Sequence, residues 1–313
     1  MINTNMNINF VVTSKPGDGL LFYSYEYCAK LNAINQPATL CIIPHRHFKP
    51  EDYMTVLNDK YASVNDVQFN DIDPKEDDIT MIMGRSQLSL AYMTWKDYNS
   101  TQKLSLFKLF GNKLISVYSD NHPKEYPMAL DYFKPKHVYD LCDTEVYPNG
   151  KGEHFEKTIN FEIYKNTSMK EKDPEIQEYL FLGTNDIYYD AVDKCIDNIE
   201  DIWTKGHGVL VYKDQGLDDW TLKREAEGKE KLNHIFAPFP DLLRKFNTYV
   251  YTKPNFDPAP RLMIEFLWAG RKVIYQRDKN LKDGGPVYWE RGVKDIAYSI
   301  PAIGNAIEKL SKY

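Results

Sequence analysis

The sequence predicts an α/β fold with two parallel sheets that face each other across a cleft. Short apolar segments alternate with helical ones along most of the chain, which is typical of parallel strands joined by crossover helices. Segments such as FVV, LCII and MIM are apolar on both faces, as strands buried between two layers are. A chain of 313 residues is also longer than one domain ordinarily needs, so two domains are expected.

The first half of the chain shows the alternation from its start. A helix is predicted directly after the first strand, because Leu20, Tyr23, Tyr27 and Leu31 recur at helical spacing. Residues 66–78 are acidic and are expected to form a solvated stretch. Strands are predicted at residues 7–15, 37–44, 78–84, 113–119 and 136–143.

The second half repeats the pattern after a break. YPNGKGEH at 147–154 and the polar stretch 165–175 interrupt the alternation, so we place an N-terminal domain at 1–150 and a C-terminal domain at 170–313. The last helix, 301–313, belongs to the second domain or packs back on the first. Strands are predicted at 178–186, 208–214, 248–253 and 272–276, with helices at 187–202, 218–233 and around 261–269.

Composition excludes several classes of protein. The chain contains no apolar run of membrane-spanning length, and its first residues lack the features of a signal peptide. Four scattered cysteines without a CxxC pair indicate neither a zinc site nor a disulfide framework. We therefore expect a reduced, cytoplasmic protein without a membrane partner. The net charge of −6 argues against nonspecific coating of nucleic acid, although a local basic groove remains compatible with it.

Residues 256–276, FDPAPRLMIEFLWAGRKVIYQ, carry the clearest functional signal. A proline-containing loop leads into an apolar helix with one acid, Glu265, and Gly270 precedes a short strand. Ligands of open α/β sheets bind at the carboxyl ends of the strands, where this helix would start. A helix N-terminus attracts phosphate, and a carboxylate accepts hydrogen bonds from hydroxyl groups. The alternative is that Glu265 is simply an exposed helix residue.

This loop, helix, glycine and strand unit resembles the donor site of GT-B glycosyltransferases, which have two Rossmann-like domains and use nucleotide sugars. The resemblance implies that Glu265 accepts hydrogen bonds from the ribose hydroxyls, and that Arg261 and the loop amides face the diphosphate. A second glutamate of the family pattern is missing, and Asp257 lies nearby instead. The matching residues are Pro260, Arg261, Leu262, Glu265, Gly270 and the strand Val273–Tyr275.

The same resemblance implies further donor-binding residues. PGDG at 16–19 follows the first strand and matches the family's glycine loop, which places Gly17 and Gly19 beside the sugar diphosphate. Lys213 ends a strand and matches a basic residue that neutralises the leaving diphosphate. HIFAPFP at 234–240 lies where the family contacts the base, and its candidates are His234, Ile235 and Phe236. The alternatives are a simple turn, a solvated lysine and core packing of the phenylalanine.

The catalytic base has several candidates. An inverting transferase needs a group that takes the proton of the acceptor hydroxyl, whereas a retaining one does not need a strong base in this form. Asp18 ranks first, followed by His122 with Asp120, and His45 and His47 also follow a strand. The acid pairs at 71–73 and 76–78 precede a strand, at the wrong end of the sheet, so no metal is expected. The nucleotide sugar, expected to be UDP-linked, is a co-substrate, and no cofactor is predicted.

The predicted activity is that of a hexosyl- or pentosyltransferase. Composition and size resemble the DNA-modifying glycosyltransferases of T-even-like phages, which add a sugar to 5-hydroxymethylcytosine. Double-stranded DNA with that base is therefore the favoured acceptor, and the host cytoplasm is the expected location. The alternatives are a bacterial polysaccharide or small-molecule glycosyltransferase, a sugar-nucleotide epimerase of the same fold, and a two-lobed sugar-binding protein. The cations expected to contact DNA are Lys15, Arg46, His47, Lys49, Arg85, Lys124, Lys134 and Lys136.

Overall fold

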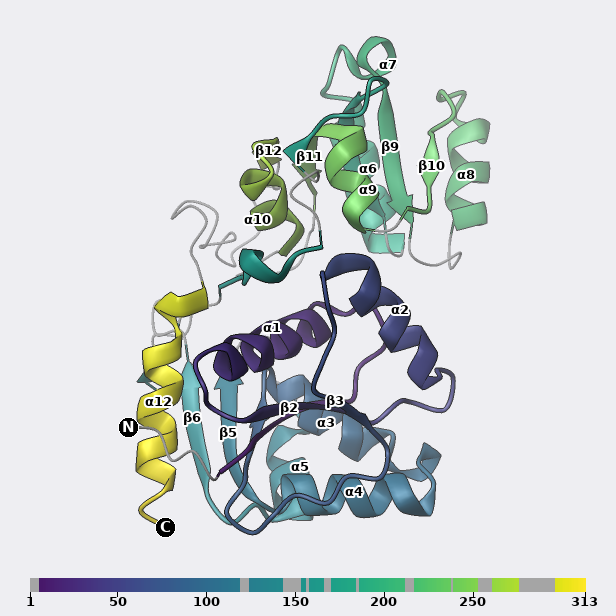
Figure 1. Cartoon of the computed structure of the whole chain (residues 1–313). Coiled ribbons are helices and arrows are strands. Elements are labelled where there is room, and N and C mark those ends of the chain that lie inside the picture. The colour runs from purple at the N-terminus through teal and green to yellow at the C-terminus, as the bar shows by residue number, and fades with distance from the viewer. Residues whose placement is uncertain are drawn as a thin grey trace. The chain divides into compact units, whose positions relative to one another are not determined.

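The chain divides into two compact units, each built on one parallel sheet (Figure 1). The first unit comprises Met1–Lys165 and Lys294–Tyr313, and the second comprises Asn166–Val293. The chain passes from the first unit to the second after Lys165 and returns to the first after Val293. The computed structural model describes residues 6–118, 124–142, 153–155, 158–165, 170–183, 186–211, 217–237, 239–252, 261–275 and 296–313.

Within these described residues the first unit has a seven-stranded sheet in the order β3-β2-β1-β4-β5-β6-β7, with every pair parallel. This is the doubly wound order, in which the direction of strand addition reverses between β1 and β4. The strands are β1 (Ile8–Val12), β2 (Ala38–Ile42), β3 (Val67–Phe69), β4 (Ile79–Ile82), β5 (Lys113–Tyr118), β6 (Val138–Cys142) and β7 (Glu153–His154).

Side chains cap the starts of two helices in the first unit. Asp18 caps the first helix, and Asn99 forms a reciprocal capping box with Gln102 at the start of another. The last helix, α12, contacts β6, and Lys309 on it donates to the hydroxyl of Tyr139 at 2.9 Å. The helices are α1 (Gly19–Ala33), α2 (Pro50–Lys60), α3 (Arg85–Met93), α4 (Ser100–Phe110), α5 (Tyr126–Phe133) and α12 (Ile300–Leu310), with short 3-10 turns η1 (Trp95–Asp97), η2 (Phe161–Ile163) and η4 (Ile296–Tyr298).

The acidic stretch 66–78 is not solvated along its whole length, so that prediction was wrong in part. It contains β3, which pairs with β2. Asp78 at its end is 4% exposed and accepts hydrogen bonds from the backbone nitrogens of Asn7, at 3.0 Å, and Lys75, at 2.8 Å. The carboxylate is buried because it satisfies backbone donors at the amino end of the sheet.

The segment before the second unit is fastened to the first by a buried carboxylate. Glu26 on α1 is fully buried and accepts hydrogen bonds from the hydroxyls of Tyr61, at 2.6 Å, and Tyr164, at 3.3 Å. The backbone nitrogen of Asn160 donates to its other oxygen at 3.2 Å. Buried carboxylates persist where several donors satisfy them, so residues 158–165 are held against α1 and the end of α2.

The second unit has a five-stranded parallel sheet among the described residues, in the order β10-β9-β8-β11-β12. Here the order reverses between β8 and β11. One face carries a core in which Phe181, Val209 and Val250 pack with Tyr189 and Trp220. The strands are β8 (Gln177–Gly183), β9 (His207–Val211), β10 (His234–Ile235), β11 (Phe246–Tyr251) and β12 (Lys272–Tyr275), and the helices are α6 (Asp186–Ile196), α7 (Ile202–Lys205), α8 (Leu217–Ala226), α9 (Phe239–Lys245) and α10 (Arg261–Trp268).

These two doubly wound sheets confirm the predicted α/β fold class. The four cysteines are buried and form no disulfide. In the part of the chain that the structure describes, no helix has the length and apolarity needed to cross a membrane. The same residues contain no cluster of three or more His, Cys, Asp or Glu side chains suited to a metal ion.

Candidate functional site

The carboxyl edge of the first sheet holds the PGDG loop, which connects β1 to α1 beside the reversal of strand order. Gly17 has a φ of 79°, a left-handed conformation that favours glycine. Gly19 lies outside that region, and a Cβ built on it would meet no atom within 4 Å. Neither backbone conformation nor packing therefore requires glycine at position 19. Glycine is also used where a ligand approaches the backbone closely, and this use is compatible with Gly19.

Asp18, the first candidate for the base, has a structural role in this loop. It is the N-cap of α1, and its Oδ1 accepts a hydrogen bond from the backbone nitrogen of Leu20 at 2.8 Å. A carboxylate offers about four acceptor positions on its two oxygens, so capping alone leaves capacity for another hydrogen bond. The catalytic role of Asp18 stays a prediction. Asp120 and His122 lie outside the described residues.

A basic segment follows β2 at the same edge of the first sheet. Arg46 Nη1 lies 3.0 Å from Asp97 Oδ1, and His45 Nε2 lies 3.6 Å from Asp97 Oδ2. Arg46 Nε donates to His47 Nε2 at 3.1 Å, so this nitrogen of His47 is an acceptor. Asp97 thus orients the side chains of His45 and Arg46. Arg46 and His47 are exposed.

Arg85 does not belong with the exposed cations, which corrects our prediction that it contacts DNA. Its side chain is buried, with its Nη2 3.1 Å from Asp140 Oδ1. Its guanidinium lies 4.3 Å from the centre of the Tyr126 ring. Arginine stacks well on aromatic rings and pairs with carboxylates, and here both interactions hold it inside the first unit.

In the second unit, α10 starts after β11, beside the reversal of strand order between β8 and β11. Glu265 is 2% exposed, and Arg261, one turn earlier, donates from Nε to Glu265 Oε1 at 2.7 Å. The Arg261 side chain is 9% exposed. The alternative of an exposed helix residue is therefore wrong for Glu265. Leu262 is half-buried at the second position of α10, and Pro260 and Lys213 lie outside the described residues.

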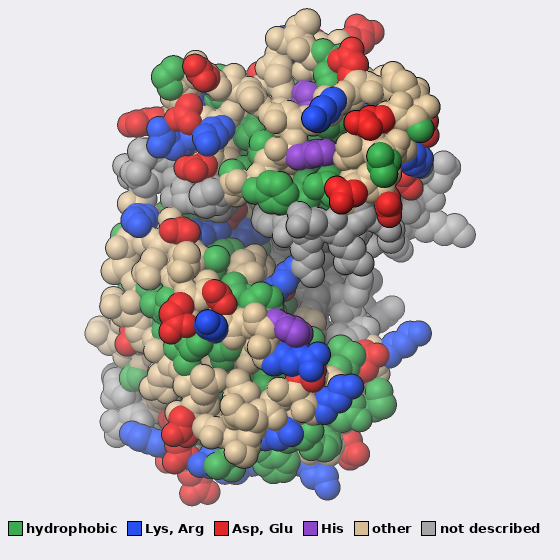
Figure 2. All heavy atoms as spheres, turned by 90° about the vertical axis from the view of Figure 1, so that its right-hand side faces the viewer, with side chains coloured by type: hydrophobic (Ala, Val, Ile, Leu, Met, Phe, Trp, Pro, Cys, Tyr) green, Lys and Arg blue, Asp and Glu red, His purple; other side chains and the backbone are tan. Residues whose placement is uncertain are grey.

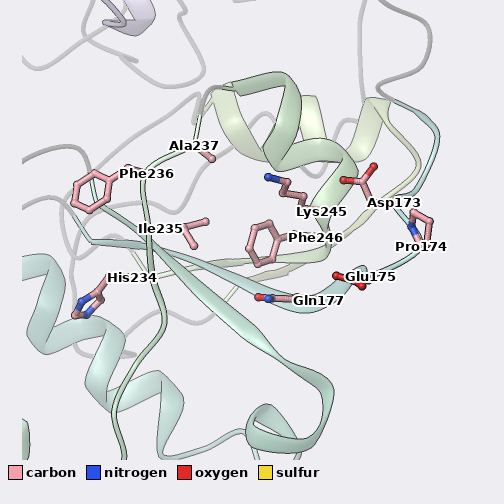
Figure 3. A pocket seen from close by; sticks show the side chains of 10 residues that line it. All are labelled: Asp173, Pro174, Glu175, Gln177, His234, Ile235, Phe236, Ala237, Lys245 and Phe246. Atoms are coloured by element: carbon pink, nitrogen blue, oxygen red, sulfur yellow. The ribbon is translucent and has the colours of Figure 1, made fainter.

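A pocket of about 680 Å³ lies in the second unit (Figure 3). Ile235 and Phe236, two of the predicted base contacts, are among its lining residues. The Phe236 side chain is 64% exposed, so core packing does not explain it. The lining residues are Asp173, Pro174, Glu175, Gln177, His234, Ile235, Phe236, Ala237, Lys245 and Phe246.

Among the described residues, no residue of α10 lines this pocket. Its lining includes Gln177 and Phe246, the first residues of β8 and β11. The seven residues of β8 place Gln177 roughly 20 Å from the carboxyl edge of the sheet. Burial, with help from Lys231 and Arg224, lowers the pKa of His234, so its imidazole is neutral at pH 7.

The structure brings together only part of the predicted donor site. It joins Arg261 to Glu265, and it places Ile235 beside Phe236 in the pocket. Sequence reasoning missed Gln87, which lies on α3, three residues after Gly84, and contacts the loop after β1. Its position in the first turn after a predicted strand was a signal that could have found it.

Comparison with known proteins supports the fold alone. No family model matches the sequence, and no curated protein matches it either. Anabaena HepE in complex with UDP-glucose is similar in structure, with a TM-score of 0.52 and 10% identity over 98% of this chain and 95% of that one. An alpha-glucosyltransferase in complex with UDP and a 13-mer DNA containing a central A:G mismatch has a TM-score of 0.51 and 12% identity over 98% and 90%.

A third structure is the N-terminal domain of Candida albicans trehalose-6-phosphate phosphatase, with a TM-score of 0.50 and 9% identity over 98% of this chain and 93% of that one. At these identities the likeness concerns architecture. The chain shares an α/β fold with these proteins, which include one complex with UDP-glucose and one with UDP and DNA. This agrees with the GT-B fold predicted from the sequence.

Proposed function

We propose that this chain is a glycosyltransferase that moves a sugar from a nucleotide diphosphate sugar, UDP-linked in our assignment, to a hydroxyl acceptor. The buried carboxylate of Glu265 carries the proposal. It lies on the helix that follows β11, and β11 is one of the two strands at the reversal of strand order, where ligands of doubly wound sheets bind. In the reaction the acceptor oxygen bonds to the anomeric carbon, the bond from that carbon to the diphosphate breaks, UDP leaves with its electron pair, and a base takes the hydroxyl proton.

Glu265 and Arg261 suit a nucleotide diphosphate as a unit. Arg261 Nε donates to Glu265 Oε1 at 2.7 Å, and a carboxylate is a good acceptor for ribose hydroxyl donors. A guanidinium has a planar geometry that suits a phosphate group. The pair would thus be set in place before the donor binds, which reduces the cost of ordering these side chains on binding.

For the acceptor, we favour 5-hydroxymethylcytosine in double-stranded DNA. Three of the predicted cations, Lys15, Arg46 and Lys49, are exposed after β1 or β2, at the carboxyl edge of the first sheet. The predicted contact His47 is exposed beside them and accepts a hydrogen bond from Arg46. On the face shown in Figure 2, blue side chains of the first unit gather around a histidine, with few red ones between them. The similar alpha-glucosyltransferase was solved with DNA. Such cations suit phosphate contacts, whose strength falls steeply as salt rises.

The test is transfer of a sugar to defined DNA. DNA duplexes that contain either 5-hydroxymethylcytosine or cytosine are incubated with the protein and UDP-glucose or other nucleotide sugars at low salt. The DNA is then digested, and the masses of the nucleosides are measured by mass spectrometry. We expect a hexose on the modified base only, and a rate that drops with salt. Calorimetry with UDP and UDP-glucose checks the donor separately. Donor binding without any DNA product would overturn the DNA acceptor, and the absence of any binding by UDP or UDP-glucose would overturn the UDP donor.

A further inference from the structure

The backbone that follows β1 is clamped at Ser14 from two sides. Gln87 Oε1 accepts hydrogen bonds from the backbone nitrogens of Thr13, at 2.6 Å, and Ser14, at 3.1 Å, and Gln87 Nε2 donates to Ser14 Oγ at 3.1 Å. From the other side the hydroxyl of Tyr53 donates to the Ser14 carbonyl at 2.8 Å. The nitrogen, carbonyl oxygen and hydroxyl of Ser14 are therefore all held by side chains. We name this arrangement the Ser14 clamp.

The two side chains of the Ser14 clamp come from elements that follow the neighbours of β1. Tyr53 lies on α2, after β2, and Gln87 lies on α3, after β4. Both β2 and β4 pair with β1, so the clamp closes around the carboxyl end of the central strand. Both side chains are buried, and water therefore cannot easily replace their hydrogen bonds.

The residues that follow the Ser14 clamp are more exposed than the clamp itself. Lys15 and Gly17 are exposed, and a Cβ on Gly17 or Gly19 would meet no atom within 4 Å. The loop is thus held at Ser14, and its residues beyond Ser14 are open to solvent up to the start of α1. Strand and helix fix the two ends of the loop, and the clamp fixes the point where it leaves the strand. A site held in this way needs little reordering when a ligand arrives.

We propose that Gln87 is a positioning residue for sugar transfer: it fixes residues 13–19 in the conformation that the reaction needs. This inference rests on the proposed function, because the loop matters only if a nucleotide sugar reacts beside it. Gln87 acts through the backbone of Thr13 and Ser14 and touches no reacting atom. The ribose and base of the donor are assigned to the second unit, and only the diphosphate is assigned to this loop. Loss of the Gln87 side chain should therefore lower the rate of transfer more than the affinity for the donor nucleotide.

The experiment compares Gln87→Leu, Gln87→Glu and a control, Asn32→Leu, in the full chain. Glutamate keeps an acceptor for both backbone nitrogens, and Ser14 can donate its hydroxyl to the carboxylate. Asn32 serves as the control because its side-chain amide, like that of Gln87, both donates to and accepts from its neighbours, but at the amino edge of the sheet. Its Nδ2 donates to the Ala38 carbonyl at 2.8 Å, and the Ala38 nitrogen donates to its Oδ1 at 2.8 Å. Release of UDP from UDP-glucose is measured with and without hydroxymethylated DNA, and UDP affinity is measured by calorimetry.

We expect Gln87→Leu to lower kcat by about 10- to 100-fold, since misplacement by an ångström has effects of that order. UDP affinity should fall less than kcat, Gln87→Glu should recover most of the rate, and Asn32→Leu should lower the melting temperature but not kcat. Tyr53→Phe should lower kcat as well, and its effect should not add to that of Gln87→Leu, because both act through Ser14.

Three results would overturn the role of Gln87: equal kcat in Gln87→Leu and Asn32→Leu, no recovery by Gln87→Glu, or a loss of UDP affinity equal to the loss of rate. The wild-type chain separates this failure from that of the proposed function. If the wild type neither binds UDP nor consumes UDP-glucose, the proposed function falls and the positioning role falls with it. If the wild type turns over, the variants decide on Gln87 alone.

Discussion

Replacing Glu265 tests the donor site most directly, and the structure changes what should be replaced. From the sequence, Glu265→Ala would weaken donor binding with little loss of stability. In the structure Glu265 is buried and accepts from Arg261, which is itself largely buried. Removing one partner of a buried ion pair costs about 3–5 kcal/mol. Glu265→Ala is therefore expected to destabilise the second unit, and weak binding by that variant would be ambiguous.

Two other variants separate folding from binding. Glu265→Gln keeps an oxygen that accepts from Arg261 Nε but removes the charge. The double variant Arg261→Met with Glu265→Leu replaces the ion pair by apolar side chains, an exchange that is often neutral for stability. Hydrogen bonds to a charged group contribute about 1.5–3 kcal/mol. At about 1.4 kcal/mol for each tenfold change, UDP affinity should fall about 10- to 100-fold in Glu265→Gln and by at least as much in the double variant.

The assay is titration calorimetry with UDP, beside a thermal melt of each variant. We expect the double variant to melt near the wild type and to bind UDP weakly. Wild-type affinity in a well-folded double variant would refute the reasoning, because it would show that Glu265 and Arg261 serve the fold alone.

Three further predictions follow from the described residues. Gly19→Ala should leave stability unchanged or raise it by up to about 1 kcal/mol, measured by chemical unfolding, yet lower turnover of UDP-glucose by about 10-fold, and unchanged turnover would remove the case for close ligand approach there. Asp18→Asn keeps a good helix cap, so UDP binding and melting should persist while transfer slows by about 10²- to 10⁴-fold, and a fully active variant would exclude Asp18 as the base. The pKa of His207 is lowered by burial and by the charges of Arg224 and His234, and its Nε2 accepts a hydrogen bond from the Asn233 nitrogen at 3.1 Å. The contribution of neutral His207 to stability is therefore present above about pH 6.5 and is lost as the pH falls through the lowered pKa. Between pH 7.5 and 5.0 the free energy of unfolding, measured with denaturant, should decline less in His207→Gln than in the wild type, and equal declines would contradict this.

Local patterns predicted the regular elements well where they are long and apolar. β1, β2, β4 and β5 were confirmed because continuous apolar segments mark buried parallel strands. The two-residue β10 and the three-residue β3 carry too few positions for a periodic signal. The helix α10 was also confirmed, and the spacing of four between Arg261 and Glu265 already allowed their pairing.

The missed contacts join residues that are distant in sequence. Gln87 bonds to Thr13 across 74 positions, and Glu26 accepts from Tyr164 across 138. No local pattern encodes such a partnership, since it depends on which strands become neighbours. Strand order thus decides which side chains meet, and it is readable only after the sheet is assembled.

The return of α12 to the first unit has a consequence for synthesis of the chain. A ribosome releases residues 166–293 before the final helix exists, so the second unit can complete its sheet while the first still lacks a part that contacts β6. Until that helix emerges, β6 and its neighbours expose the surface that α12 later covers. A fragment that stops before residue 294 should therefore contain a complete second unit and a first unit that lacks α12. When the two units are expressed separately, the first unit without α12 should aggregate more readily than the second.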